Sequence, residues 1–484
     1  MRGALKARQA GNRRGGTRGY PGCLVRGQPP VPHTECNQAK FSFHPDFDID
    51  VQADAPKLSS DGGLLLLRQA DERTDTCRWF AGCLPDDRDS KKVRHDRLEQ
   101  VRQRVYQIAM GYEDCNDSED LRHDPMFKTA CDLSPDDDED ALSSQPTLSR
   151  FENAVSGRML NQLRQRLEDS YVAGLPADTH VVVLDIDSTD DETHGRQQLS
   201  FFHGFYDQHM YHPLLVFDGE SGQLVSVLLR PGNAHAARSA TPLLRGLIRR
   251  IKARFPQAQV VVRADAGFCV PRLLVMLEEL DAELGDVDYV IGIAKNPRLL
   301  AMAETTMAEA GRWHEESGRH VRHFSSCSYA AETWGRERHI VIKAEHGERG
   351  ANPRFVVTSL DGFPPQLIYD RAYCARGNSE NFIKDFKNAL AADRLSCGAF
   401  KANFFRLLLH AAAYRLMYTV RLAAAVVAPE LGRVQFDTLR LRLLKVAAHV
   451  TQSVRRILIR LPRVFPFAAA FRALAGHLAR PSPA

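Results

Sequence analysis

Short apolar runs with turn signals between them mark the middle of the chain. They cover residues 181–187, 214–217, 224–229, 260–264 and 289–293. Between the later runs, residues 236–255 and 271–280 carry apolar side chains at helical spacing. Runs of this length and helices of this period give the order β-β-β-α-β-α-β. That order predicts an α/β fold in which helices cover the faces of a mixed sheet.

The same order matches the ribonuclease-H-like fold, so we expect a catalytic domain of that class over residues 147–400. Further strand-like runs at 321–329, 339–344 and 355–359 predict a β-rich insertion at about residues 297–370 of this domain. The insertion therefore separates the strands of the sheet from everything that follows it in the chain.

Helical patterns flank this domain. We expect a helical N-terminal region with a linker over 39–146, and a basic helical region over 401–484 in which Leu439, Leu443, Val446 and Val450 recur at helical spacing. Ser149 and Glu152 have the spacing of a capping box, which predicts a helix start. The lead-in to that helix resembles a helix-turn-helix recognition helix, although any helix can begin in this way.

Composition places the chain among ordinary globular proteins, with 44% hydrophobic and 26% charged residues in 484. The net charge is only +4, but both ends are basic and an acidic cluster lies at 136–140. The basic ends suit a polyanion, and solvated surface is the alternative. Residues 1–38 are rich in Gly, Arg and Pro without periodicity, which predicts a disordered tail.

Cysteine spacing and hydropathy exclude other classes. The ten cysteines form no C-x-x-C pair, which argues against structural zinc and favours reduced thiols in a cytosolic protein. No signal peptide is visible, and no apolar run reaches membrane-spanning length without charge. We therefore expect a cytoplasmic protein with no membrane partner.

Two carboxylates end apolar strands. Asp187 closes the run 181–187, and Asp265 follows the run 260–264 and precedes Gly267. Because side chains alternate along a strand, Asp185 and Asp187 point to the same face, and either is a candidate ligand. Asp187 is favoured because it is nearer the strand end. A helix cap is the alternative role for Asp265.

A third acid lies on a later helix. Glu380 is near the start of a helix predicted to run through Leu390, and Arg376 and Lys387 are expected on the same face. The alternative is an ordinary amphipathic surface helix with weak Glu–Arg pairs, which would show the same pattern. Two strand-end carboxylates and one helix carboxylate are a donor set that holds a pair of divalent cations.

The spacing around Glu380 resembles a known family. Tyr373, Arg376, Glu380 and Lys387 match, position by position, the signature at the third acid of DDE transposases from insertion sequences with β-strand insertions. The segments around Asp187 and Asp265 are similar to the family's first and second acid motifs. Several segments look most like insertion-sequence family thirteen-eighty: 60–63, 184–187, 194–197 and 229–233. The resemblance covers residues from about 36 to about 420.

The resemblance implies a DNA transposase that cuts and joins DNA at terminal inverted repeats. It implies catalytic, metal-binding acids Asp187, Asp265 and Glu380, with Mg²⁺ as cofactor and Mn²⁺ as its substitute. Tyr373, Arg376 and Lys387 match positions that contact the DNA backbone. The implied partners are the transposon-end and target DNA, bound partly by the N-terminal helices, in a homodimeric DNA complex within the bacterial nucleoid. Trp313 and Trp334 are candidates for stacking on a flipped base, and ordinary packing is the alternative.

Other functions remain possible from the residues alone. A ribonuclease-H-like nuclease that cuts DNA without joining it uses the same acids. An inactive DNA-binding derivative conflicts with the intact triad. A glycosidase with Asp185 and Asp187 as its paired carboxylates would take Phe201, Phe202 and Tyr206 as sugar platforms, but leaves the spacing around Glu380 unexplained.

Overall fold

The computed structural model describes residues 38–480 except 44, 48, 53 and 138. Its packing divides the chain into two compact units, Met1–Pro56 and Lys57–Ala484. In the first unit, strands β1 (Gln38–Phe41) and β2 (Ile49–Gln52) pair as an antiparallel hairpin. Apart from Gln38, the tail predicted to be disordered lies outside the described residues. Everything below concerns the second unit.

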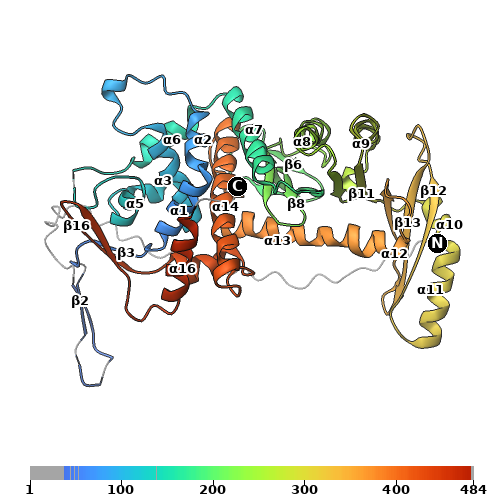
Figure 1. The fold of residues 1–484 in the computed structure, drawn as a ribbon. Coiled ribbons are helices and arrows are strands. Elements are labelled where there is room, and N and C mark those ends of the chain that lie inside the picture. The colour runs from blue at the N-terminus through green and yellow to red at the C-terminus, as the bar shows by residue number, and fades with distance from the viewer. Residues whose placement is uncertain (1–37, 44, 48, 53, 138, 481–484) are drawn as a thin grey trace, which may run out of the picture. The chain divides into compact units, whose positions relative to one another are not determined.

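A mixed sheet forms the centre of the larger unit (Figure 1). Its middle strands lie in the order β9-β8-β4-β10-β11, with β4, β10 and β11 parallel to one another and β8 antiparallel to its neighbours. The strands are β4 (Val181–Ser188), β8 (Leu214–Asp218), β9 (Leu224–Leu228), β10 (Gln259–Ala264) and β11 (Val287–Ile293). The prediction of an α/β fold with a mixed sheet is confirmed.

Side-chain alternation gives this sheet two apolar faces. Val182, Leu184 and Ile186 of β4 pack in one cluster with helices α8 (Ala240–Arg254) and α9 (Pro271–Leu284). Val183 faces the other way, into a smaller cluster with Val261, Val290, Ile368 and Tyr369. Burial on both faces explains why β4 and β10 are continuous runs of valine rather than alternating patterns. Asp185 and Asp187 share the face of Val183.

The insertion extends the same sheet. Strand β15 pairs with β11 on one side and β13 on the other, and β12 lies beyond β13. The three predicted strands are present, but two helices precede them. The elements are α10 (Pro297–Met302), α11 (Glu304–Ser317), β12 (Val321–Tyr329), β13 (Arg338–Gly347), β14 (Gly350–Ala351) and β15 (Arg354–Thr358).

A helical segment returns from the insertion across the sheet face that carries Val183 (Figure 1). It begins with α12 (Pro365–Leu367) and contains α13 (Ser379–Lys384). Wide π-type turns occupy Ile368–Tyr373 and Asp385–Ala389, and a tight 3₁₀ stretch covers Cys374–Asn378. Changes of winding rotate side chains around the helix axis, so the regular face predicted for Arg376, Glu380 and Lys387 does not form.

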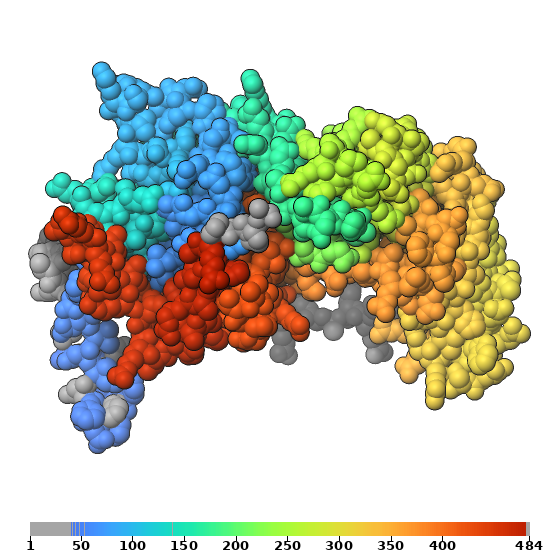
Figure 2. Space-filling view, in the orientation of Figure 1, coloured from blue at the N-terminus to red at the C-terminus, as the bar shows by residue number. Residues whose placement is uncertain are grey.

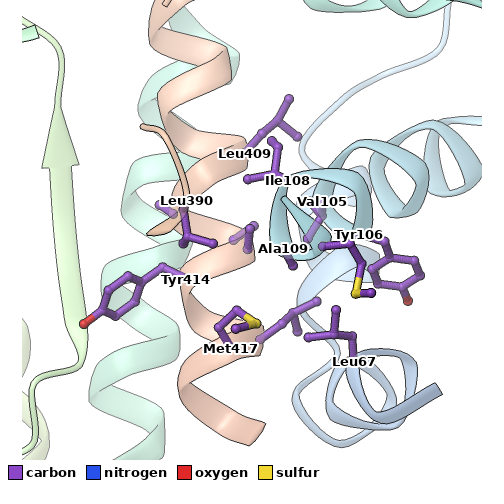
Figure 3. Packing of buried hydrophobic residues seen from close by; sticks show 14 of the residues in the cluster. Leu67, Val105, Tyr106, Ile108, Ala109, Leu390, Leu409, Tyr414 and Met417 are labelled. Atoms are coloured by element: carbon purple, nitrogen blue, oxygen red, sulfur yellow. The ribbon is translucent and has the colours of Figure 1, made fainter. Parts of the chain in front are cut away.

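Helices from both ends of the chain share one core around α14 (Phe400–Val427). Figure 3 shows Leu409 of α14 beside Ile108 of α3 (Arg97–Met110), and Met417 near Leu67 of α1 (Leu64–Thr74), while Tyr414 points to the opposite side of α14. None of the described helices combines the length and apolar composition that a bilayer span requires. The N-terminal helices are α1 (Leu64–Thr74), α2 (Thr76–Gly82), α3 (Arg97–Met110), α4 (Ser118–Leu121), α5 (Pro125–Ala130), α6 (Gln145–Asn153) and α7 (Gly157–Gly174), with 3₁₀ turns at Ser90–Lys92 and Cys115–Asp117.

The predicted capping box is wrong. Helix α6 begins at Gln145, so Ser149 and Glu152 lie inside it. Glu152 is buried and pairs with Arg104 at 2.8 Å, with Arg406 of α14 at 3.7 Å. Ser149 and Glu152 have the spacing of a capping box, but Glu152 forms an ion pair in the core and does not cap a helix. The predicted boundaries near residues 146 and 400 stay predictions, since helices on both sides of them contribute to the same core.

The predicted C-terminal helix through Val450 is also wrong. Helix α15 (Phe436–Leu439) continues as a wide turn to Leu444, and the chain then becomes extended. Strand β16 (Ala448–Ser453) pairs with β17 (Arg456–Arg460) and with β3 (Leu58–Ser59). Val446, Ala448 and Val450 are buried at a period of two, which the four-residue spacing concealed. Helix α16 (Ala468–Leu478) follows, and Figure 2 shows this red segment against the blue N-terminal helices.

Candidate active site

Neighbouring parallel strands bring two of the predicted acids together. In the ladder between β4 and β10, Asp185 lies opposite Arg263 and Ile186 opposite Ala264. Asp187 and Asp265 are therefore the next residues at the same end of adjacent strands. Asp265 has extended backbone and begins a 3₁₀ turn, in which its Oδ1 accepts a hydrogen bond from the Gly267 amide at 2.9 Å. The predicted capping role of Asp265 and a role as ligand are compatible, because this bond uses one oxygen.

Asp185 is committed to a buried ion pair. Its two carboxylate oxygens accept hydrogen bonds from Arg263 at 2.6 and 2.8 Å, and the side chains are 0% and 3% exposed. The turn after β8 closes over this pair at Gly219, where a Cβ atom would lie 2.3 Å from the guanidinium. Arg263 also donates to the Ala372 carbonyl of the returning helix at 3.2 Å. Asp185 is thus the counter-charge of Arg263, which contacts both the sheet and the returning helix. Asp187 is therefore the candidate ligand on β4.

Asp187 lies in a desolvated and negatively charged environment. Burial raises the pKa of Asp187 to about 6, the nearby Arg376 guanidinium opposes the rise, and the Asp265 carboxylate adds to it. Arg376 donates to Asp187 Oδ2 at 3.1 Å. The strand register and the effect of the Asp265 charge on the pKa of Asp187 both indicate that the two acids are close, and Arg376 is the cation that contacts Asp187.

Tyr373 lies on the other side of Asp265. A Cβ atom added to Gly292 of β11 would be 2.6 Å from the Tyr373 hydroxyl and 3.4 Å from the Asp265 carbonyl carbon. The absence of a side chain at Gly292 therefore makes room for the phenol beside the acid. A cavity of about 360 Å³ opens here, lined in part by Tyr373, Lys295 and Arg354. Its cations lie next to the strand end that carries Asp265.

Lys387 contacts a second group of acids. Its ammonium lies 2.8 Å from Asp190 and 3.8 Å from Asp393. Asp191, the next residue after Asp190, is 1% exposed and neither of its oxygens has a hydrogen-bond partner among the described residues. Burial, then the nearby Asp393, raises the pKa of Asp191 well above its ordinary range. Lys387 is accordingly the counter-charge of this group.

Glu380 does not lie in one group with Asp187 and Asp265. It lies on α13 with an exposed side chain, whereas Arg376 and Lys387 are half-buried against acids that follow β4. Across the described residues, no three His, Cys, Asp or Glu side chains are grouped closely enough to hold one ion. The triad of Asp187, Asp265 and Glu380 therefore stays a prediction, while the structure does bring together Asp187, Asp265, Tyr373 and Arg376.

Sequence reasoning missed two residues beside the site. Arg263 interrupts an apolar strand, and a cation buried in a sheet needs a buried carboxylate. That signal predicts an acidic partner, which the structure shows to be Asp185. The second is Tyr206, which the sequence suggested only as a sugar platform and not as a neighbour of Asp187 and Asp265. Burial raises its pKa to about 12, with further contributions from Asp190, Asp187 and Asp265. No local pattern predicts this approach, because it depends on a small sheet that the periodicity does not reveal.

That small sheet follows β4 directly. It consists of β5 (Asp191–Glu192), β6 (Phe201–His203) and β7 (Gln208–Tyr211), with β7 in the middle. Gln208 of β7 donates to Asp190 at 3.1 Å. The hairpin of β6 and β7 is thereby attached to the same Asp190 that contacts Lys387.

Two known structures with some likeness to the chain are transposase–DNA complexes. A piggyBac transposase synaptic complex with hairpin DNA aligns at 10% identity over 80% of each chain, with a TM-score of 0.39. A Mos1 transposase paired-end complex with the left transposon end aligns at 12% identity over 48% of this chain and 74% of that chain, with a TM-score of 0.17. With TM-scores this low, neither structure is evidence for the fold or the function of this chain.

No curated protein matches the chain. A family model does, and it is described as a transposase DDE domain, group 1. The match covers residues 41–483, which is nearly the whole chain and includes every predicted site residue. The chain therefore belongs to the group 1 family of transposase DDE domains.

Proposed function

We propose that the protein is a transposase that cleaves DNA at the terminal inverted repeats of an insertion sequence and joins the freed ends to target DNA. The observation that carries the proposal is the pair Asp187 and Asp265 at the ends of adjacent parallel strands, where Asp187 is largely buried and contacts the Arg376 cation. Such a carboxylate pair is poorly explained by packing and well explained by a catalytic role.

The donor set fits a hard divalent cation. Asp187 and Asp265 offer carboxylate oxygens, the ligands that Mg²⁺ and Mn²⁺ prefer, and their mutual repulsion favours a bound positive charge. Glu380 is the third ligand of the proposal. Its carboxylate is exposed and engaged in no ion pair within the described chain, so it is available for this role. When bound, such ions supply an activated water or 3′-hydroxyl and stabilise the leaving oxygen.

The protein's own residues orient the acids and hold phosphates. The backbone ladder of β4 and β10 brings Asp187 and Asp265 to the same strand end, and the ion pair of Arg263 with Asp185 adds stability to these two strands. Arg376 contacts Asp187 and is suited to a phosphate at the same place, since a guanidinium binds carboxylates and phosphates alike. Tyr373 and the cavity with Lys295 and Arg354 extend this cationic surface past Asp265.

A second cationic surface supports DNA as the partner. Among the N-terminal helices a cavity of about 510 Å³ is lined by basic side chains: Arg88, Lys92, Arg94, Arg97, Arg122 and Arg150. Arg150 has no carboxylate partner in the described part of the chain. The other five cations each lie within 4 Å of a nearby carboxylate, so Arg150 is the side chain of this surface that is left to bind a phosphate. DNA supplies phosphates along its whole length, and their binding to such cations makes the affinity depend on salt.

Four finer parts of the proposal come from the resemblance of the sequence motifs. They are assignment to insertion-sequence family thirteen-eighty, a ribonuclease-H-like class for the catalytic domain, a homodimer in the DNA complex, and action at the bacterial nucleoid. The strand order β9-β8-β4-β10-β11, with antiparallel strands on one side and parallel strands on the other, supports the ribonuclease-H-like class.

The test is a cleavage and joining reaction with the full chain. The DNA that flanks the coding sequence is labelled and incubated with Mg²⁺ and a target plasmid. We expect cuts at inverted repeats, none in EDTA, and labelled ends joined to the plasmid. Asp265→Asn and Glu380→Gln should abolish cutting and keep DNA binding, because each removes a ligand charge and no DNA contact.

Matched controls are Asp178→Asn and Glu430→Gln, the same chemical changes at exposed positions. Cutting without any joining would favour the nuclease alternative. Normal cutting by Asp265→Asn or Glu380→Gln would remove that acid from the site.

A further inference from the structure

An exposed aromatic patch lies on the hairpin of β6 and β7. Phe201, Phe202 and Phe205 are 41%, 52% and 85% exposed. They lie within five consecutive positions and are joined at the turn by Gly204. Phe201 and Phe202 are successive residues of β6 and face opposite sides of the hairpin, and Phe205 lies at its turn. Each of the three rings exposes area that burial would stabilise. An exposed apolar patch of this kind marks a binding surface.

The hairpin has a rigid support. A Cβ atom on Gly232 would lie 1.9 Å from the Met210 carbonyl oxygen and 2.5 Å from that of Phe201, so the backbones are in direct contact. Buried Arg230 donates to the His212 carbonyl at 2.7 Å and to the Arg238 carbonyl at 2.8 Å. The motif at residues 229–233 thus fixes the base of the hairpin. Its tip is exposed while its base cannot move far.

The patch is next to the candidate active site. Gln208 of the hairpin and Lys387 of the returning helix contact the same carboxylate, Asp190, at 3.1 and 2.8 Å. Tyr206 at the turn contacts the Phe205 ring edge-on, with ring centroids 5.0 Å apart, and the His203 ring at a tilt, with centroids 5.1 Å apart. The same Tyr206 is close enough to Asp187 and Asp265 for their charges to affect its pKa. A strand held at the acids therefore passes beside the rings.

The charges around the hairpin suit a nucleic acid. Arg196 lies just before β6, and Arg238 lies in the loop that supports the hairpin. Both guanidinium groups are exposed, and neither pairs with a carboxylate among the described residues. Phenyl rings flanked by unpaired cations are the combination that binds single-stranded DNA, in which bases stack and phosphates pair with cations.

We propose that the β6–β7 hairpin is a stacking platform for unpaired bases of the DNA strand that is cut at Asp187 and Asp265. This rests on the proposed function. The platform holds the bases next to the scissile bond out of the duplex, which gives the acids access to the backbone. A paired end resists this unstacking, so the protein should prefer DNA in which those bases are already unpaired.

The experiment measures binding without cleavage. The full chain is titrated in EDTA with duplex DNA carrying the flanking sequence, either fully paired or forked by a few mismatches, with 2-aminopurine as the unpaired base. We expect the wild type to bind the forked DNA more tightly and to quench its fluorescence. Phe205→Ala should lose about tenfold in affinity for the forked DNA, which is a typical effect of removing one stacked ring, and the double variant F202A/F205A should lose more.

Two controls isolate stacking from fold. Phe205→Trp should keep the preference, because it keeps an aromatic face. Phe363→Ala removes an equally exposed ring, 52% exposed, from a loop outside the hairpin and should have no effect. Circular dichroism of each variant checks that the fold is intact.

Equal affinity of the wild type for forked and paired DNA would overturn the proposal. An unchanged preference and unchanged quenching in F202A/F205A would do the same. Cleavage of the flanking DNA in Mg²⁺ is scored separately on the same preparations. A wild type that prefers forked DNA through Phe205 but never cuts would contradict the proposed function and leave the stacking platform standing.

Discussion

Replacing Asp185 with Asn should weaken the fold and leave the chemistry nearly intact. The change leaves the Arg263 guanidinium, 3% exposed, without a charged partner in the sheet. Removing one member of a buried ion pair costs about 3–5 kcal/mol, because the remaining charge stays desolvated. Unfolding entropy is about 2.1 cal/mol/K per residue, so for a cooperative unit of roughly 430 residues the loss corresponds to a fall in Tm of about 3–5 °C.

The assay is thermal unfolding followed by circular dichroism, together with DNA cleavage well below Tm. Asp178→Asn is the surface control and should leave Tm unchanged. The double change Asp185→Leu with Arg263→Met should recover most of the loss, since apolar pairs of similar volume commonly replace buried ion pairs. The reasoning would be refuted by an Asp185→Asn protein with wild-type Tm and no cleavage, which is the behaviour of a metal ligand.

Three further outcomes follow from the same contacts. Arg376→Ala and Lys387→Ala should each lower the slope of log affinity against log salt by about one if they bind phosphates, measured by fluorescence anisotropy; unchanged slopes would leave them as counter-charges of Asp187 and Asp190. Truncation after residue 430 should leave little folded protein by circular dichroism and gel filtration, because side chains of α15 and α16 are buried in the main core; a folded product lacking only DNA assembly would contradict this. Arg150→Ala should weaken DNA binding without changing the cutting rate of saturated enzyme, and unchanged affinity would remove the basic cavity from the DNA surface.

The sheet was predictable because its strands leave a strong local signal. Runs of valine in β4 and β10 have no helical period, and they are buried on both faces. The C-terminal strands were not predictable in the same way. Val446 and Val450 fit a helix and a strand equally well, and the choice is made by pairing of β16 with β3, which lies almost 400 residues earlier in the chain. Residue periodicity contains no information about such a partner.

The site was predictable in part for the same reason. Asp187 and Asp265 were identified because each ends an apolar strand, and parallel pairing then brings them together. The sequence left Asp185 and Asp187 as alternatives, because both point to one face. Only the three-dimensional position of Arg263 separates them. Glu380 was expected on a regular helix face with Arg376, and the wide turns on either side of α13 change that geometry.

Manganese binding tests the central claim most directly. Crystals of the full chain with flanking-repeat DNA, grown with Mn²⁺, would show the ions by their anomalous scattering. The account predicts peaks in contact with the carboxylates of Asp187, Asp265 and Glu380, and their loss in Asp265→Asn. Peaks at Asp190 and Asp393 instead, or a Glu380 carboxylate remote from every ion in the DNA complex, would contradict it.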